Sequence, residues 1–211
     1  MGKEFEAQIL DIDIKKMRKY LKENNGKRVH KNIKLVRAVF KRCNSNIKGF
    51  VRVRYEGKNT TMTVKIYNDK KFPDESEITI QEDFKTGRKF LQALNLKEKS
   101  YQETFREKWS LPIKSVHEIT FDTWPGLPTY MEIDCTNEKT LNQVIKLLKV
   151  DKAKISYGSV GIKYDLYYGI TEKAINEKIP TLTFNSIKKE IKPKKNITLF
   201  NQVVQDQKSL Y

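Results

Sequence analysis

The chain has 211 residues, 38% of them hydrophobic, and a formal net charge of +16. This length suits a single domain over residues 1–211 with a substantial core. The sequence contains no run of about 18 apolar residues and no signal-peptide core, which predicts a soluble, cytoplasmic protein without a membrane span. Cys43 and Cys135 belong to no spaced motif, so we expect free thiols rather than a zinc site.

The first predicted strand is acidic, and a helix follows it. Glu4-Phe5-Glu6 alternates charged and apolar residues, which in a strand places both carboxylates on one face. Residues 13–24 carry Ile14, Met17 and Leu21 at helical spacing before an Asn-Asn-Gly stop. The chain therefore begins with a pair of carboxylates on one strand face and an amphipathic helix.

Three strands with one polar and one apolar face are predicted next, and a second amphipathic helix follows at residues 83–95. The strands cover residues 50–55, 61–66 and 77–81, and their polar faces carry, in that order, Arg52 with Arg54, Lys65, and Glu77.

The acidic alternation returns in the second half of the chain. Residues 116–122 place Glu118, Thr120 and Asp122 on one strand face, and His117 is expected on the other. Glu132-Ile133-Asp134 repeats the pattern of the N-terminal strand. Residues 137–150 have the apolar stripe of a third helix.

The helices decide where the polar strand faces point. A polar face in an ordinary sheet meets water, but helices that cover the apolar faces would turn the polar faces inward. We therefore predict an α+β fold, a closed antiparallel barrel of roughly eight strands with a polar lumen and amphipathic helices outside. Acids in the lumen suit Mg²⁺ or Mn²⁺, and Arg52, Arg54 and Lys65 suit phosphate oxygens.

The same residues, in the same order, resemble the CYTH superfamily of triphosphate tunnel enzymes, which includes class IV adenylyl cyclases, thiamine triphosphatases and inorganic triphosphatases. The resemblance spans about residues 3–169 and leaves residues 170–211 as a C-terminal extension with a basic tail. Its motifs are an N-terminal Glu-x-Glu-x-Lys, matched by Glu4, Glu6 and, imperfectly, Gln8; the paired Arg52 and Arg54; Lys65; Arg106 within residues 101–109; and Asp122-Thr-Trp-Pro-Gly-Leu followed by Glu132-Ile-Asp134.

The resemblance implies a role for each matching residue. Its metal ligands would be Glu4, Glu6, Glu77, Asp122, Glu132 and Asp134. Its catalytic residues would be Glu4, Glu6, Arg52, Arg54, Lys65 and Arg106. Its substrate-binding residues would be Arg52, Arg54, Lys65, Arg106, Lys108, Lys163 and Gln8. The clearest departures are Gln8, where the signature has lysine, and Asp134, where glutamate is usual.

Two reactions fit such a site, and the sequence leaves both open. Water attacking the terminal phosphorus gives a triphosphatase, which we favour because no adenine-reading motif is present. The ribose hydroxyl attacking the α-phosphorus gives a class IV-type adenylyl cyclase, which converts ATP to cyclic AMP and pyrophosphate. The net charge of +16 supports a third hypothesis, that the protein is an RNA 5′-triphosphatase with a nucleic-acid-binding surface. A protein that binds a phosphorylated ligand without turnover is the remaining alternative.

The last part of the chain carries less information. Residues 171–178 are typical of a helix, and residues 188–195 are basic and contain proline. We expect residues 170–211 to form a surface tail, with a cover over one tunnel mouth as the alternative. The oligomeric state cannot be read from the sequence.

Overall fold

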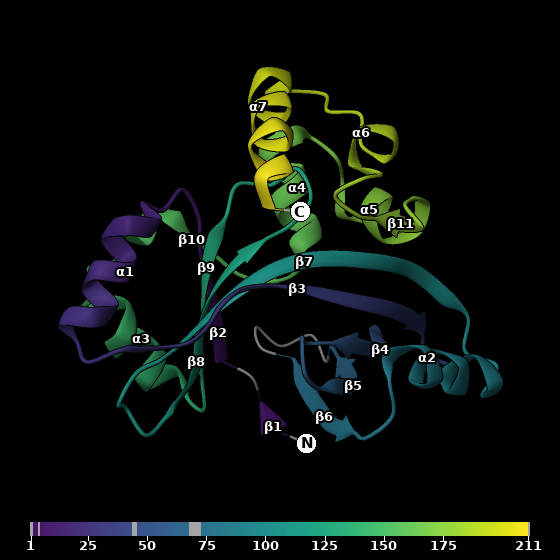
Figure 1. Ribbon diagram of the computed structural model, residues 1–211, viewed down its shortest axis with the longest axis horizontal. Coiled ribbons are helices and arrows are strands. Elements are labelled where there is room, and N and C mark those ends of the chain that lie inside the picture. Colours follow the sequence, from purple (N-terminus) through teal and green to yellow (C-terminus); the bar gives the residue numbers. More distant parts are fainter. Residues whose placement is uncertain (1, 4, 44–45, 68–72, 211) are drawn as a thin grey trace.

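The computed structural model describes residues 2–3, 5–43, 46–67 and 73–210. It is an α+β structure in which a curled, mainly antiparallel sheet forms a half-barrel with helices packed around it (Figure 1). Its strands are β1 (Gly2–Lys3), β2 (Phe5–Ile9), β3 (Lys27–Lys41), β4 (Gly49–Tyr55), β5 (Thr60–Ile66), β6 (Asp74–Ile80), β7 (Glu98–Ser110), β8 (Val116–Thr123), β9 (Tyr130–Cys135), β10 (Ile155–Ser156) and β11 (Thr181–Leu182). Its α-helices are α1 (Ile14–Glu23), α2 (Phe84–Ala93), α3 (Glu138–Leu147), α4 (Val160–Tyr168), α5 (Glu172–Lys178), α6 (Ile187–Glu190) and α7 (Ile197–Gln207).

The three helices predicted inside the motif region are confirmed, and a side chain caps the start of each. Asp13 accepts a hydrogen bond from the backbone N–H of Lys16, Asp83 from that of Thr86, and Asn137 from that of Thr140. A cap of this kind stabilises a helix by about 1 kcal/mol, because it satisfies a donor that has no partner within the helix. The helices therefore begin where the sequence indicates.

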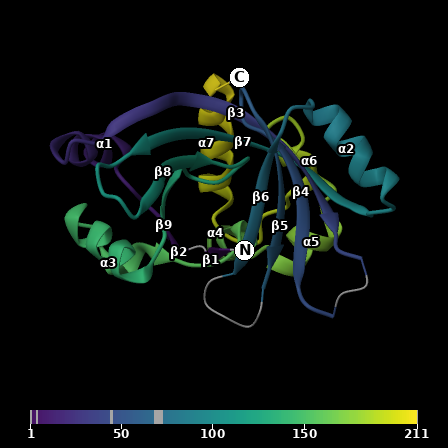
Figure 2. The ribbon, with the colours of Figure 1, turned by 90° about the horizontal axis from the view of Figure 1, so that it is seen from below.

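The helices cover the convex side of the sheet, as predicted. Leu21 of α1 and Val144 of α3 pack in one core with Ile119 and Ile133 of the sheet. Leu91 of α2 belongs to a separate core under β3 and β4. Figure 2 shows β4, β5 and β6 side by side with α2 beside them, while α1 and α3 lie at the other end of the sheet. The polar strand faces are therefore left for the concave side.

The strands pair in the order β1-β6-β5-β4-β3-β7-β8-β9-β2-β10, and β11 pairs with β7. The long strands β3 and β7 arch over the sheet (Figure 1), and register shifts interrupt their pairing. β1 pairs with β6 and β2 pairs with β9, so segments separated by one residue reach opposite ends of the sheet. The described strands form a curled half-barrel, and the predicted closed barrel of eight strands is not confirmed.

The C-terminal residues form a packed lobe rather than the expected surface tail. Phe200 and Val204 of α7 are only 3% and 4% exposed and share a core with Tyr164 and Tyr168 of α4. The helix predicted at residues 171–178 is confirmed as α5, with Thr171 as its cap. The tail prediction was wrong. The apolar residues of this segment are spread over several short elements, and they meet in one core only in the folded structure.

This C-terminal lobe forms hydrogen bonds with the turn that follows β8. The hydroxyls of Tyr164 and Tyr168 donate hydrogen bonds to the carbonyls of Pro125 and Gly126, over 2.6 and 2.5 Å. Gln207 of α7 accepts from the N–H of Gly126 and donates to the carbonyls of Trp124 and Leu127. Apart from the backbone hydrogen bond from Leu127 to Trp124, these hydrogen bonds of the turn come from the C-terminal residues.

Cys43 is exposed and Cys135 buried, and both are free thiols. Across the residues that the structure describes, every helix is too short or too polar to span a bilayer.

Candidate functional site

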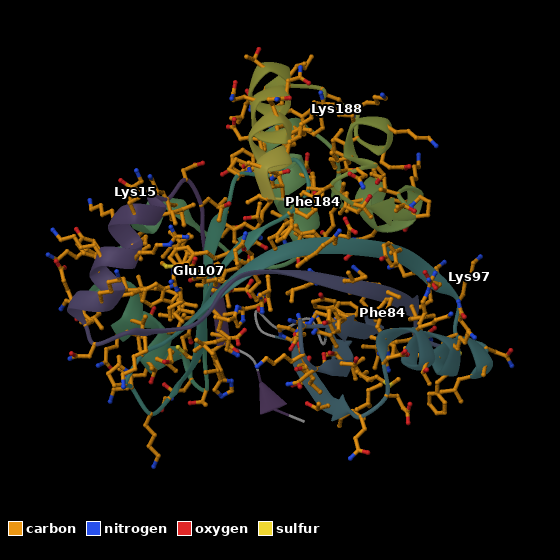
Figure 3. The ribbon with its side chains drawn as sticks, viewed as in Figure 1. Lys15, Phe84, Lys97, Glu107, Phe184 and Lys188 are labelled. Carbon is orange, nitrogen blue, oxygen red and sulfur yellow. The ribbon has the colours of Figure 1, made fainter. Side chains whose placement is uncertain are left out.

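The polar strand faces converge on the concave side of the sheet, which we call the lumen. Lys65 Nζ of β5 lies 3.7 Å from Glu6 Oε1 of β2, although these strands are far apart in the strand order. The opposite faces point outward: Glu107 of β7, labelled in Figure 3, lies on the side of α1 and accepts two hydrogen bonds from Arg18 of that helix. Alternation along each strand therefore separates a charged inner face from an outer face covered by helices.

Arginines and a lysine from β4 and β5 form the basic side of the lumen. Arg52 Nη2 donates to Thr63 Oγ1 at 3.0 Å and to Glu77 Oε2 at 3.2 Å. Arg54 Nη2 lies 3.6 Å from the same carboxylate oxygen, and Lys65 Nζ lies 3.1 Å from Glu75 Oε2. The carboxylates of β6 thus hold these cations in place. Glu77, expected as a metal ligand, is engaged by both arginines.

Arg106 of β7 forms ion pairs with three carboxylates. Its Nε and Nη2 donate to the two oxygens of Asp122 at 2.7 and 2.5 Å, and Glu118 accepts from its Nη1 at 3.0 Å. Burial would lower the pKa of Arg106, but Asp122, Glu118 and Glu132 outweigh it and hold that pKa well above the ordinary value. Asp122, also expected as a metal ligand, is therefore committed to a bidentate ion pair.

Glu118 is a site residue that the sequence assignment left out. It forms an ion pair with Lys108 as well as with Arg106. Burial would raise its pKa, but Arg106 and Lys108 outweigh burial and hold the pKa at about 2. Lys108, predicted to bind substrate, therefore already has an anionic partner at the edge of the lumen.

Carboxylates with too few cationic partners form the acidic side. Glu6 lies opposite Asp134 in the pairing of β2 with β9. Burial raises the pKa of Asp134 to about 8, and the nearby charges of Glu118, Glu132, Glu6 and Glu75 add to the effect. Burial, with Glu6 and Asp122, likewise raises the pKa of Glu132 to about 7. Asp134 Oδ1 is buried and has no hydrogen-bond partner among the residues that the structure describes.

These carboxylates fit a divalent cation in their chemistry. They offer only oxygen atoms, which Mg²⁺ and Mn²⁺ prefer, and the unpartnered Oδ1 of Asp134 is a free ligand position. Within the described ranges no three Asp, Glu, His or Cys side chains form a ready metal cluster. Glu4, the remaining expected ligand, lies outside the described residues.

Lys163 of α4 reaches the acidic side from the C-terminal lobe. It is 1% exposed, and its Nζ donates to Gln8 Oε1 at 2.5 Å and lies 5.1 Å from the ring centre of Tyr130. Gln8 Nε2 in turn donates to Glu132 Oε2 at 3.1 Å. Burial lowers the pKa of Lys163 to about 8, although Glu132, Glu6 and Asp122 oppose that shift. The structure therefore brings an ammonium group to the position of Gln8.

Two placements differ from the sequence-based expectations. His117 was expected to point away from the lumen. Its ring is largely exposed, yet its Nδ1 lies 3.4 Å from Asp134 Oδ2, next to a register shift between Val116 and Glu118. Arg37 was missed altogether because β3 was not predicted as a strand. The run of apolar and β-branched residues around it, 33–40, was the available signal.

Comparisons with known proteins support the fold. No protein-family model and no curated protein matches the chain. Among solved structures, a candidate adenylate cyclase from Vibrio parahaemolyticus is 11% identical, with 75% of this chain and 95% of that one covered and a TM-score of 0.61. A conserved hypothetical protein from Pyrococcus furiosus is 16% identical, with 74% and 97% covered and a TM-score of 0.60. The candidate adenylyl cyclase HpAC1 from Hippeastrum, which has a dominant triphosphatase activity, is 12% identical, with 78% and 94% covered and a TM-score of 0.51. The chain therefore shares the fold of these solved structures.

Proposed function

We propose that this protein is a divalent-metal-dependent triphosphatase that hydrolyses a nucleoside, inorganic or other organic triphosphate. One observation carries the proposal: a single lumen holds a cluster of guanidinium groups on one side and buried carboxylates with raised pKa values on the other. Polyphosphate chains need cations along their oxygens, and divalent cations need carboxylates. A lumen of this composition therefore suits a metal-bound triphosphate better than a neutral ligand.

We further propose that the lumen is a closed tunnel in the working protein. The pairing supports this, because β1 and β2 are nearly contiguous in sequence and reach β6 and β9 at the two ends of the sheet order. The ion pair between Lys65 and Glu6 spans the same seam. A closed barrel of about eight strands has an interior that can hold one small ligand.

The basic residues would bind the triphosphate. Arg52, Arg54 and Arg106 present planar forks suited to phosphate oxygens, and Lys65 adds a point charge. Their carboxylate partners fix the side chains before substrate arrives, so little reorganisation is needed when negative charge develops in the transition state.

The acidic residues would hold the cation. Glu6, Glu132 and Asp134 are the described candidates, and Glu4 is the fourth by motif. A bound Mg²⁺ or Mn²⁺ would neutralise phosphate charge and lower the pKa of a water molecule. Glu77 and Asp122 would contribute ligands only by releasing their arginines, so we assign them first to positioning those cations.

Lys163 would supply the positive charge that Gln8 lacks. In the family that the motifs resemble, a lysine occupies the position of Gln8. Here the ammonium group comes from α4, and the amide of Gln8 connects it to Glu132 through hydrogen bonds. The C-terminal lobe would therefore complete the site rather than merely cover it.

The alternative is a class IV-type adenylyl cyclase, which the likeness to the Vibrio protein favours. The two reactions share metal and triphosphate binding and differ in the nucleophile and the products. The assay is an incubation with Mg²⁺ or Mn²⁺ and separate samples of ATP, inorganic triphosphate, thiamine triphosphate and 5′-triphosphorylated RNA, with products resolved by mass.

Release of orthophosphate from one of these samples, and its loss in Glu132→Gln, would establish the triphosphatase activity and identify the substrate. Glu23→Gln, which changes a glutamate on the exposed side of α1, is the matched control and should be fully active. Pyrophosphate with cyclic AMP would overturn hydrolysis in favour of the cyclase.

A further inference from the structure

Arg37 is a lumen cation that no motif accounts for. It lies opposite Arg54 in the pairing of β3 with β4 and opposite Gln102 in the pairing with β7. The next residue, Ala38, is fully buried in the outer core under α2, so alternation places Arg37 on the inner face. Its guanidinium carbon lies 4.2 Å from the ring centre of Trp124, in the turn held by the C-terminal lobe.

The charge of Arg37 is compensated only weakly, by the more distant carboxylate of Asp122. Arg52, Arg54 and Arg106 each form an ion pair with at least one carboxylate. Arg37 forms none with any side chain in the described ranges, and the indole face of Trp124 is a much weaker partner for a cation than a carboxylate. Burial lowers its pKa well below the ordinary value, and repulsion from Arg52, Arg54 and Arg106 lowers it further. Such a cation destabilises the empty protein.

Several hydrogen-bond donors around Arg37 are also unused. Four buried donors have no hydrogen-bond acceptor among the described residues: Arg37 Nε, Arg52 Nε, Arg54 Nε and Trp124 Nε1. Buried donors without acceptors are costly, and they seldom persist unless an absent ligand satisfies them. Neighbouring donors of this kind, with a net positive charge, call for an anion with several oxygens.

We propose that Arg37, held against Trp124, is a further phosphate-binding residue that extends the row of cations from Arg54 toward the turn after β8. This inference rests on the proposed function, since it assigns Arg37 to the same polyphosphate site. Its ligand class is a linear polyphosphate, because Arg52 and Arg54 follow each other along the inner face of β4 and Arg37 lies beside Arg54 on the neighbouring strand.

The test measures tripolyphosphate binding by isothermal titration calorimetry and thermal unfolding without ligand, both in excess chelator so that no metal-dependent turnover occurs. Arg37→Met keeps much of the side-chain volume and removes the charge. Arg37→Lys keeps the charge but loses the fork. Lys34→Met is the matched control, because Lys34 lies on the outer face of β3 in an ion pair with Glu103.

We expect Arg37→Met to raise the Kd for tripolyphosphate by about tenfold to a hundredfold, as for the loss of a charge-assisted hydrogen bond. Its melting temperature without ligand should equal or exceed that of the wild type, because a desolvated, unpaired charge is removed. Arg37→Lys should recover part of the affinity, and Lys34→Met should leave the Kd unchanged.

Three results would overturn the inference. Equal Kd values for the wild type and Arg37→Met would leave the proposed function standing and remove Arg37 from the site. A drop of several degrees in the ligand-free melting temperature of Arg37→Met would make the residue a structural one. If the wild-type protein itself does not bind tripolyphosphate, the proposed function fails and this inference fails with it.

Discussion

Asp134→Asn should change how stability depends on pH in the metal-free protein. The carboxyl group of Asp134 is buried among other carboxylates, and its pKa is about 8 against an ordinary value of 3.8. Between these two values the folded protein holds a proton that the unfolded chain has lost. The free energy of unfolding therefore falls as pH rises through this window.

The magnitude follows from the size of the shift. Each pH unit inside the window costs about 1.4 kcal/mol, so Asp134 alone should remove about 4 kcal/mol of stability between pH 5 and pH 8. If the folded pKa is one unit lower, the loss is about 3 kcal/mol. The asparagine side chain cannot ionise, so the variant should lack this contribution.

Urea denaturation at half-unit pH steps in excess chelator measures the effect. The wild type should lose several kcal/mol more than Asp134→Asn between pH 5 and pH 8, as estimated above. Asp165→Asn, at an exposed position of α4, is the control and should follow the wild type. Equal pH slopes for the wild type and Asp134→Asn would refute the view that Asp134 is a half-buried carboxyl group whose pKa is raised by the carboxylates around it. Adding Mg²⁺ at pH 8 should restore stability to the wild type more than to the variant.

Three further predictions test other parts of the structure. Glu118→Gln should lower the free energy of unfolding at pH 7 by up to about 3 kcal/mol, because Glu118 has a pKa of about 2; urea titrations should show this difference vanishing as pH falls from 4.5 to 2. Lys163→Gln should reduce triphosphate hydrolysis, and adding Gln8→Lys should restore it, whereas Gln8→Lys alone should lower the melting temperature by crowding two ammonium groups. Gln207→Ala should destabilise the protein by roughly 2–4 kcal/mol in thermal unfolding, because the N–H of Gly126 and the carbonyl of Leu127 lose their side-chain partner, while the carbonyl of Trp124 keeps the N–H of Leu127.

Local patterns in the sequence were sufficient for several helices and strands and for the alternation that gives each of those strands a polar face. The helix caps at Asp13, Asp83 and Asn137 and the alternation around Arg52 and Glu132 depend only on near neighbours. The α+β architecture with helices outside the sheet is confirmed, whereas the closed barrel stays a prediction. These features are set by backbone periodicity, which a single sequence displays directly.

Features that depend on pairing between distant segments could not be predicted. The register between paired strands decides which carboxylate lies next to which arginine. The ion pairs of Glu77 and Asp122 with arginines were therefore not predicted. The contact between Gln8 and Lys163 joins residues 155 positions apart. Arg37 lies in β3, where apolar residues occur on both sides of the arginine, so the sequence shows no alternation that would mark a polar inner face.

The most direct test of the central claim follows inorganic triphosphate by phosphorus NMR in the presence of the purified protein. With Mg²⁺ or Mn²⁺, the account predicts conversion to pyrophosphate and orthophosphate, loss of turnover in chelator, and loss of turnover in Glu132→Gln. Intact triphosphate in the presence of either metal ion, together with formation of cyclic AMP from ATP in a parallel sample, would contradict it.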